Sequence, residues 1–287
     1  MYRTRVRAVS IDGVVIAPER ASISVFDRGL LYGDGCFEVL RTWGGVARDL
    51  DAHLDRLFET VRVLQLKTME RARLIEAVYR TIAAAGPAPE DHRLRIVLTR
   101  GPGGLGMRLA ELGPGVTIVM VEPLPAVPAE ISLVVVDWPL PPRTSRGHKT
   151  LAYLDHVIAH ELARERGADD AIRLDADGHA VEGATCNLFA VSGGTVITPP
   201  ADAGVLPGIV RARVLALCAD AGVRTMVRPL GLRDLRSADE LFVTSSLRGV
   251  VPVTRLDDGV WQRGPLTAQL ARAYTTAMRV APQRSDL

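Results

Sequence analysis

The sequence predicts an α+β fold with two domains. Strand-like segments outnumber helical ones and often follow one another as hairpins, which argues against a doubly wound parallel sheet. With 287 residues the chain is long enough for two modest domains. A segment with three prolines, 123–130, is typical of an interdomain linker. We therefore expect a small domain over 1–122, a linker over 123–130 and a larger domain over 131–287.

The first half alternates between strand and helix patterns. The pair Asp12-Gly13 favours a tight hairpin turn. Residues 51–66 place their apolar side chains on one helical face, and the helix that follows ends at Gly86. The expected elements, in order, are a hairpin over 5–16, a strand over 36–42, helices over 51–66 and 70–85, and strands over 93–99 and 116–122.

The second half contains further hairpins and three helices. The turn at Asp177-Gly178 joins two strands, and Gly167 and Gly222 end helices. The expected elements are a strand over 131–137, a helix over 151–166, paired strands over 170–174 and 180–191, a helix over 208–221, strands near 225–229, 240–244 and 250–254, a helix over 265–279 and a loose tail over 280–287.

Composition and charge exclude several classes of function. The net charge is only +2, and no Lys/Arg stripe with interleaved aromatic residues is present, so nucleic-acid binding is not expected. No apolar run approaches the length of a membrane span, and the N-terminus lacks the apolar core of a signal peptide. The three cysteines are odd in number and match no metal spacing, so we expect reduced thiols in a cytoplasmic protein.

Three motifs suggest ligands that their surroundings do not support. Residues 101–106 (GPGGLG) satisfy a dinucleotide pattern, but the stretch before the next strand is too short for a crossover helix. We expect a glycine-rich loop between antiparallel strands. His156 and His160 stand four apart on a predicted helix without a third ligand, and 175–178 resembles the start of a calcium loop but lacks its glutamate. No metal site is predicted.

Lysine is rare in this chain. Of 35 basic residues only Lys67 and Lys149 are lysines. Because ordinary surface charge is supplied by arginine here, a remaining lysine is a candidate for chemistry that arginine cannot perform. Lysine can lose its proton near neutral pH and attack a carbonyl. Lys67 ends an amphipathic stretch, where a solvated side chain is expected, so Lys149 is the candidate nucleophile.

Five ordered segments carry a resemblance to a known family; they are 24–38 (SVFDRGLLYGDGCFE), 53–57 (HLDRL), 148–154 (HKTLAYL), 182–189 (EGATCNLF) and 206–211 (LPGIVR). Together they resemble the class IV pyridoxal-phosphate enzymes, which include branched-chain and D-amino-acid aminotransferases, (R)-amine transaminases and aminodeoxychorismate lyase. The resemblance implies fold type IV, with a small N-terminal α/β domain and a larger C-terminal pseudo-barrel α/β domain. It also implies a homodimer with pyridoxal 5'-phosphate bound between the domains.

The resemblance assigns roles to residues around the cofactor. Lys149 matches the lysine that holds the cofactor as an imine and shuttles a proton. Glu182 matches the carboxylate that pairs with the pyridine nitrogen, and Arg56 matches the arginine that grips the phosphate. Tyr153 matches a tyrosine that hydrogen-bonds the phenolic oxygen in branched-chain members, although Ala152 replaces the asparagine common before it.

The same comparison assigns the remaining phosphate contacts. Leu206 lies in a turn that leads into a helix, whose first N–H groups, at Ile209 and Val210, suit an anion. Residues 244–246 match a hydroxyl-bearing loop that completes the phosphate cup through Ser245 and, above all, Ser246.

The substrate site departs from the usual D-amino-acid enzymes. Their Arg-x-His carboxylate trap is replaced here by 105–107 (LGM), and the lyases' arginine at Leu105 is absent too. Arg93 and Arg95 are two apart on a strand and face the same way, so we expect them to bind the substrate carboxylate. The alternative is a solvent-facing pair. We also place three further residues at the substrate pocket: Tyr32, Phe37 and Leu247.

These substitutions favour an atypical D-amino-acid aminotransferase, which moves an amino group between an amino acid and a 2-oxo acid. Two alternatives stay open within the family. One is a branched-chain L-amino-acid aminotransferase, favoured by Phe37 and the 104–107 loop. The other is aminodeoxychorismate lyase, which would use Lys149 and release pyruvate and 4-aminobenzoate. A non-enzymatic or oxidoreductase function would be favoured if the pure protein held no pyridoxal phosphate.

Overall fold

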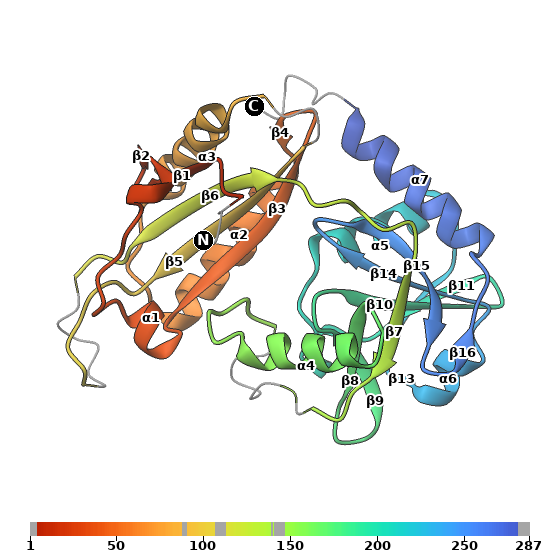
Figure 1. Cartoon of the computed structure of the whole chain (residues 1–287). Coiled ribbons are helices and arrows are strands. Elements are labelled where there is room, and N and C mark those ends of the chain that lie inside the picture. Colours follow the sequence, from red (N-terminus) through yellow and green to blue (C-terminus); the bar gives the residue numbers. More distant parts are fainter. Residues whose placement is uncertain (1–4, 88–90, 107–112, 139, 141–146, 281–287) are drawn as a thin grey trace. The chain divides into compact units, whose positions relative to one another are not determined.

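The computed structural model describes residues 5–87, 91–106, 113–138, 140 and 147–280 (Figure 1). The chain divides into two compact units. The first comprises Met1–Ala126 together with His148–Tyr153, and the second comprises Val127–Gly147 together with Leu154–Leu287. The short segment 148–153 is assigned to the larger domain by sequence order, whereas its contacts group it with the first unit.

The first unit contains a six-stranded sheet in the order β2-β1-β6-β5-β3-β4, with all neighbouring strands antiparallel. Its strands are β1 (Ala8–Ile11), β2 (Val14–Ile16), β3 (Gly35–Trp43), β4 (Val46–Ala47), β5 (His92–Thr99) and β6 (Thr117–Pro123). Its helices are a 3-10 turn, η1 (Pro18–Arg20), and α1 (Arg28–Tyr32), α2 (Leu50–Leu64) and α3 (Arg71–Ala85).

Helices α2 and α3 pack against this sheet (Figure 1). The apolar stripe of α2 is buried, with Leu54 and Leu57 almost fully excluded from solvent, as the period of the sequence predicts. Leu74 and Val78 of α3 join the same core. The hairpin between β1 and β2 turns where Asp12 and Gly13 both have positive φ, of 51° and 83°.

The second unit contains a ten-stranded sheet in the order β12-β11-β10-β14-β15-β7-β8-β9-β13, with β16 paired to β15. Its strands are β7 (Ile131–Val135), β8 (Asp170–Leu174), β9 (His179–Gly183), β10 (Asn187–Ser192), β11 (Thr195–Thr198), β12 (Thr225–Val227), β13 (Leu230–Gly231), β14 (Glu240–Ser245), β15 (Gly249–Leu256) and β16 (Gly259–Val260). Its helices are α4 (Leu154–Glu165), η2 (Ala201–Ala203), α5 (Ile209–Asp220), α6 (Leu232–Arg236) and α7 (Pro265–Arg279).

The second sheet is mixed. Three strand pairs are parallel, β15 with β7, β7 with β8 and β11 with β12, and the other pairs are antiparallel. Helix α4 packs against β7 and β8, while α7 packs against β14, β15 and α5. Within the described residues, strands therefore predominate and pair mostly with their sequence neighbours, which confirms the α+β prediction.

Two predicted elements differ from the structure. The strand expected over 180–191 is two strands, because a tight turn, in which the Gly183 N–H donates to the Cys186 carbonyl, separates β9 from β10. The helix expected to begin at 151 begins at Leu154, because the residues before it are held in an extended segment beside β3. None of the helices in the described part of the chain is long and apolar enough to cross a membrane.

Candidate active site

The segment that carries Lys149 lies along β3 in the first unit. The Phe37 N–H donates to the Lys149 carbonyl and the Leu151 N–H donates to the Gly35 carbonyl, both at 2.9 Å. A side chain at position 35 is excluded, because a Cβ atom there would clash with the carbonyl oxygen of Leu98 and lie 2.7 Å from Cδ1 of Leu151, in the segment that carries Lys149. The glycine in the first matching segment thus lets the lysine-bearing segment approach the sheet.

The Lys149 amine lies over aromatic rings. Its Nζ atom is 4.8 Å from the centre of the Phe37 ring and 5.4 Å from that of Tyr153. The two rings meet edge to face, with centroids 5.0 Å apart. Three of the residues predicted from the sequence, Lys149, Tyr153 and Phe37, are therefore brought together within one unit.

Arg95 belongs to the same group, and Arg93 does not. The Arg95 guanidinium lies 4.1 Å from the Phe37 ring centre. Burial is the largest influence on Arg95 and lowers its pKa, an effect to which Arg93 also contributes. Arg93 instead donates from Nε to Glu122 Oε1 over 2.6 Å, across the β5–β6 pair. The expected pair is thus reduced to one arginine beside the Lys149 group.

Tyr32 contacts the glycine-rich loop. Its hydroxyl donates to the Leu105 carbonyl over 2.6 Å, and the Arg28 side chain covers its ring and donates to the Gly106 carbonyl over 2.8 Å. The loop joins β5 to β6, which are antiparallel, as expected from the missing crossover helix. Met107 lies outside the described residues.

Arg56 has a buried partner that the sequence did not reveal. Its Nε and Nη2 atoms donate to the two carboxylate oxygens of Glu38, each at 2.7 Å. Burial, the largest effect, opposes ionisation of Glu38, but the charge of Arg56 and the hydrogen bonds from His53 and Arg56 outweigh it and lower its pKa to about 2. Since this carboxylate is ionised, His53 Nδ1 must donate to it, over 2.7 Å.

In the second unit, Glu182 is held at the end of β9. Its Oε2 atom accepts from the Leu206 N–H at 3.0 Å and from Asn187 Nδ2 at 3.3 Å. Asn187 Nδ2 also contacts the Leu206 carbonyl at 3.0 Å. The carboxylate is 8% exposed, so one oxygen is fixed by these donors in a largely dry setting. Asn187 is a positioning residue to which the sequence reading assigned no role.

Helix α5 begins beside Asn187. Gly208 is its N-cap, with no side chain to cap the first N–H groups, which belong to Ile209 and Val210. A Cβ atom at position 208 would lie 1.9 Å from Asn187 Oδ1, so the backbone can come this close only as glycine. The open helix N-terminus, the Leu206 turn and Glu182 are therefore tied to one another through Asn187.

Hydroxyl groups stand at the end of β14, which pairs with β10. Thr244 lies opposite Asn187, and its buried Oγ1 has no hydrogen-bond partner among the described residues. The Ser245 hydroxyl accepts from Arg248 Nε at 3.2 Å. Ser246 and Leu247, predicted at the phosphate and the substrate, occupy the same half-buried turn. The second unit therefore brings Glu182 together with Asn187 and Leu206. The hydroxyl-bearing residues begin at Thr244, which is paired with Asn187 across β10 and β14.

Two further polar groups near Glu182 were not predicted. Arg173 lies directly opposite Glu182 in the β8–β9 pair, is fully buried, and its Nη2 is 3.2 Å from His156 Nδ1. His156 Nδ1 also lies 2.9 Å from the Ala184 carbonyl. Nδ1 can accept from Arg173 only when it carries no proton, and it can donate to the Ala184 carbonyl only when it carries one. A single tautomer therefore cannot satisfy both contacts. Because four consecutive residues of β8 are buried, no period-two pattern in the sequence could have indicated that Arg173 lies inside.

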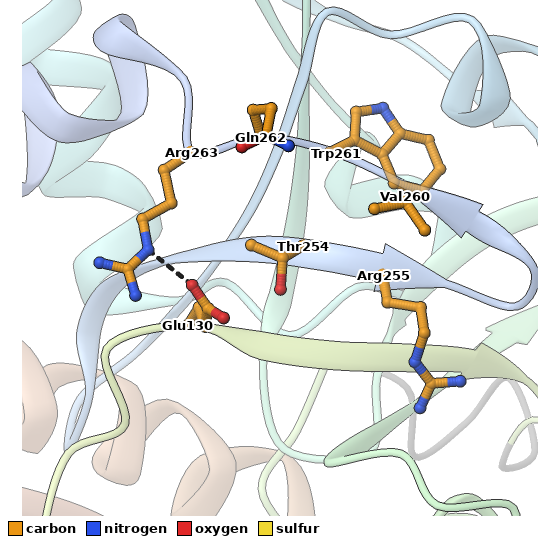
Figure 2. A pocket seen from close by; sticks show the side chains of 7 residues that line it. All are labelled: Glu130, Thr254, Arg255, Val260, Trp261, Gln262 and Arg263. Carbon is orange, nitrogen blue, oxygen red and sulfur yellow. Dashed lines mark hydrogen bonds and ion pairs between the residues drawn. The ribbon is translucent and has the colours of Figure 1, made fainter.

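Two other features of the second unit need no ligand. Asp175, Asp177 and His179 offer ligand atoms within 4.8 Å of one another, but Asp175 Oδ1 accepts from the N–H groups of Asp177 and His179 and so forms the β8–β9 turn. Figure 2 shows a surface hollow lined by Glu130, Thr254, Arg255, Val260, Trp261, Gln262 and Arg263. The hollow lies near the C-terminal end of β15, at Thr254 and Arg255. None of the predicted site residues lines it.

Comparisons with known proteins show to which family the chain is similar. A family model described as amino-transferase class IV matches residues 35–256. A protein of Methanocaldococcus jannaschii, whose name assigns it provisionally to the branched-chain-amino-acid aminotransferases, is 34% identical over 93% of this chain and 94% of its own. The D-alanine aminotransferase of Bacillus licheniformis is 27% identical over 94% of this chain and 96% of its own.

A solved structure shares the fold. The branched-chain aminotransferase of Thermoproteus uzoniensis, determined with norvaline, superposes with a TM-score of 0.90 and 29% identity, covering 96% of this chain and 95% of its own. The similarity therefore extends over both units, and it includes relatives named for branched-chain amino acids and for D-alanine.

Proposed function

Because the chain belongs to the class IV aminotransferase family, a family of pyridoxal-phosphate-dependent transaminases, we propose that it moves an amino group between a 2-amino acid and a 2-oxo acid, with Arg95 binding the carboxylate. The observation that carries this proposal is the group formed by Lys149, Tyr153, Phe37 and Arg95. It combines an amine, a phenol and a half-buried cation, which suits a substrate that carries both a reacting nitrogen and a carboxylate.

The described residues fit the cofactor. The α5 N-terminus offers unpaired N–H groups to a phosphate, and the buried Thr244 hydroxyl needs a partner that the described residues do not supply. We propose that Ile209, Val210, Ser245 and Ser246 hold the phosphate, and that Arg56, held in place by its pairing with Glu38, donates to it as well. Glu182 offers a fixed carboxylate for the ring nitrogen and Tyr153 a hydroxyl for the phenolic oxygen.

The chemistry divides between cofactor and chain. When bound, pyridoxal phosphate supplies an aldehyde that takes up the amino group and a protonated ring that draws electrons from the substrate α-carbon. We propose that the Lys149 amine takes the proton from the substrate α-carbon and delivers it to carbon C4′ of the cofactor. Glu182, fixed by Leu206 and Asn187, keeps the proton on the ring nitrogen. Phe37 and Tyr153 exclude water around the amine.

The hand of the substrate is the finer part of the proposal. The sequence favours a D-amino acid, because the usual Arg-x-His trap is absent and arginine on β5 takes its place. An L-branched-chain substrate is the second candidate, favoured by the names of the M. jannaschii and T. uzoniensis proteins. Tyr32 and Leu247 are retained as proposed substrate contacts under either candidate.

A spectral experiment tests the function and the hand together. The purified protein is mixed separately with D-alanine, D-glutamate or L-leucine, without a 2-oxo acid, while the visible band of the bound cofactor is recorded. Loss of the band with D substrates alone supports the D-specific enzyme, and loss with L-leucine alone supports the branched-chain enzyme. A yellow protein inert to all three favours the lyase or an amine transaminase over both proposed amino-acid specificities, whereas a colourless protein contradicts the cofactor assignment.

Replacing Arg95 by alanine is expected to raise KM for both the amino acid and the 2-oxo acid by roughly 10- to 100-fold, because a charge-assisted hydrogen bond to the carboxylate is lost. Cofactor affinity should stay unchanged. Arg93→Ala is the matched control, since Arg93 lies two residues away on β5 and is paired with Glu122. Equal KM values for the Arg95→Ala variant and the unmodified enzyme in steady-state kinetics would refute the carboxylate role.

We further propose a homodimer. Apolar side chains are exposed before and within α1 and in the adjoining loop: Ile23, Val25, Phe26, Leu30 and Leu105. The two segments are joined by a hydrogen bond from the Gly103 N–H to the Phe26 carbonyl and by a bridge between Asp27 and Pro102. Exposed apolar side chains gathered on two adjoining segments are typical of an interface. The three cysteines are free and buried, which supports a reducing, cytoplasmic location.

A further inference from the structure

Arg248 connects two turns of the second unit. It lies in the turn between β14 and β15, with its side chain 18% exposed. Its Nε donates to Ser245 Oγ at 3.2 Å, and its Nη2 donates to Asp170 Oδ2 at 3.1 Å and to the Thr185 hydroxyl. Ser245 belongs to the hydroxyl-bearing turn, whereas Thr185 belongs to the turn between Glu182 and Asn187.

Asp170 fixes the other end of this connection. It is fully buried at the start of β8. Its Oδ1 accepts from the N–H groups of Ala171 and Ala184 at 2.9 and 3.0 Å, and its Oδ2 accepts from the Thr185 hydroxyl. With Cys186 Sγ, which also donates to Oδ2 at 3.5 Å, the carboxylate therefore holds the β9–β10 turn through three donors, from Ala184, Thr185 and Cys186. A buried ion pair such as that of Arg248 with Asp170 adds little net stability by itself. Its geometry, which fixes the positions of two turns, is therefore more informative about its role.

The two hydroxyls that Arg248 contacts differ in whether their proton is already donated to an acceptor within the protein. Thr185 donates its proton to Asp170 and accepts from Arg248, so its hydroxyl is satisfied within the protein. Ser245 accepts from the Arg248 Nε and, at 3.4 Å, from its backbone N–H. Among the described residues, Ser245 donates to no acceptor. An oxygen that already accepts from a cation keeps its one proton for an acceptor outside the protein, such as an anion.

We propose that Arg248 is a positioning residue that orients the Ser245 hydroxyl as a donor to the cofactor phosphate and, through Asp170, fixes the Ser245 turn relative to the turn between Glu182 and Asn187. This inference rests on the proposed function, in which Ser245 contacts the phosphate. Arg248 itself acts through Ser245 and need not touch the cofactor. Arg248 cannot be recognised from the sequence alone, because an arginine in a turn is normally a solvated charge.

The experiment measures the affinity of the cofactor-depleted protein for pyridoxal 5'-phosphate and for pyridoxal, which lacks the phosphate. Arg248→Met and Ser245→Ala should each weaken binding of pyridoxal phosphate by roughly tenfold, the effect of one hydrogen bond to a charged group, and leave pyridoxal binding unchanged. The double variant should be no weaker than the weaker single variant, because both remove the same donor. Arg248→Lys should recover only part of the affinity, since one ammonium cannot span Ser245 and Asp170 in the planar arrangement of a guanidinium.

Arg263→Met is the matched control. Arg263 donates to Glu130 at 2.6 Å in the surface hollow of the same unit, where both partners are about half exposed (Figure 2). This variant should change neither affinity. If Arg248→Met lowers the melting temperature and weakens both ligands equally, or weakens neither, the positioning role is refuted while the Ser245 contact stands. If Ser245→Ala binds pyridoxal phosphate as the unmodified protein does, the proposed phosphate contact fails as well.

Discussion

Replacement of Lys149 by alanine is expected to lower kcat by about 10⁴-fold, the upper end of what a positioned acid–base group contributes. The variant loses both the amine that joins the cofactor and the proton carrier beside Phe37 and Tyr153. The phosphate contacts and Glu182 remain, so the variant should still bind pyridoxal phosphate, with a spectrum closer to that of the free aldehyde. Steady-state kinetics and the visible spectrum of the variant check this result.

Lys67→Ala is the control for this experiment. Lys67 is the other lysine of the chain, and its backbone carbonyl accepts from the Gly115 N–H at 3.0 Å. That hydrogen bond does not depend on the side chain, so kcat should be unchanged. Retention of more than a tenth of the activity by Lys149→Ala, or loss of activity in Lys67→Ala, would contradict the assignment of the reactive amine.

The helices were predictable where one apolar stripe decides the structure. The pattern over 265–279 predicts α7, which spans Pro265–Arg279, and the pattern over 51–66 predicts α2, which spans Leu50–Leu64. In each case burial of a 3.6-residue period against a sheet agrees with local propensity. The short helices α1 and α6, each of five residues, were missed because a stretch of that length carries too few turns to show a period.

The site was predictable only as residue types, because partners distant in sequence decide what each side chain can do. Arg93 and Arg95 have the same spacing and direction on β5, yet Glu122 on the next strand occupies one and leaves the other beside Phe37. Similarly, nothing local to Arg248 indicates that Asp170 lies across the sheet. Such pairings follow from strand order, which a single sequence without homologues does not determine.

Glu38→Gln is expected to lower the free energy of unfolding by about 3–5 kcal/mol, because it leaves the buried guanidinium of Arg56 without a counter-charge. The Arg56 and Glu38 side chains are 9% and 1% exposed, so water cannot replace the lost partner. Glu59→Gln is the control on the same helix as Arg56, since Glu59 pairs with Arg62 in full exposure and its loss should have no measurable effect. Urea unfolding of the two variants and the unmodified protein measures the difference.

The pH dependence of the same comparison separates charge from packing. Glu38 has a pKa of about 2 in the folded protein against an ordinary value of 4.5, so its contribution is complete above pH 4.5. As pH falls below that value the unfolded chain takes up the proton first, and about 3 kcal/mol is lost by the time pH reaches the folded pKa. Glu38→Gln cannot titrate, so its deficit relative to the unmodified protein should shrink between pH 6 and pH 3 in cofactor-free samples. A deficit that is equal at both pH values would mean that Glu38 acts through packing, and that Arg56 does not depend on its charge.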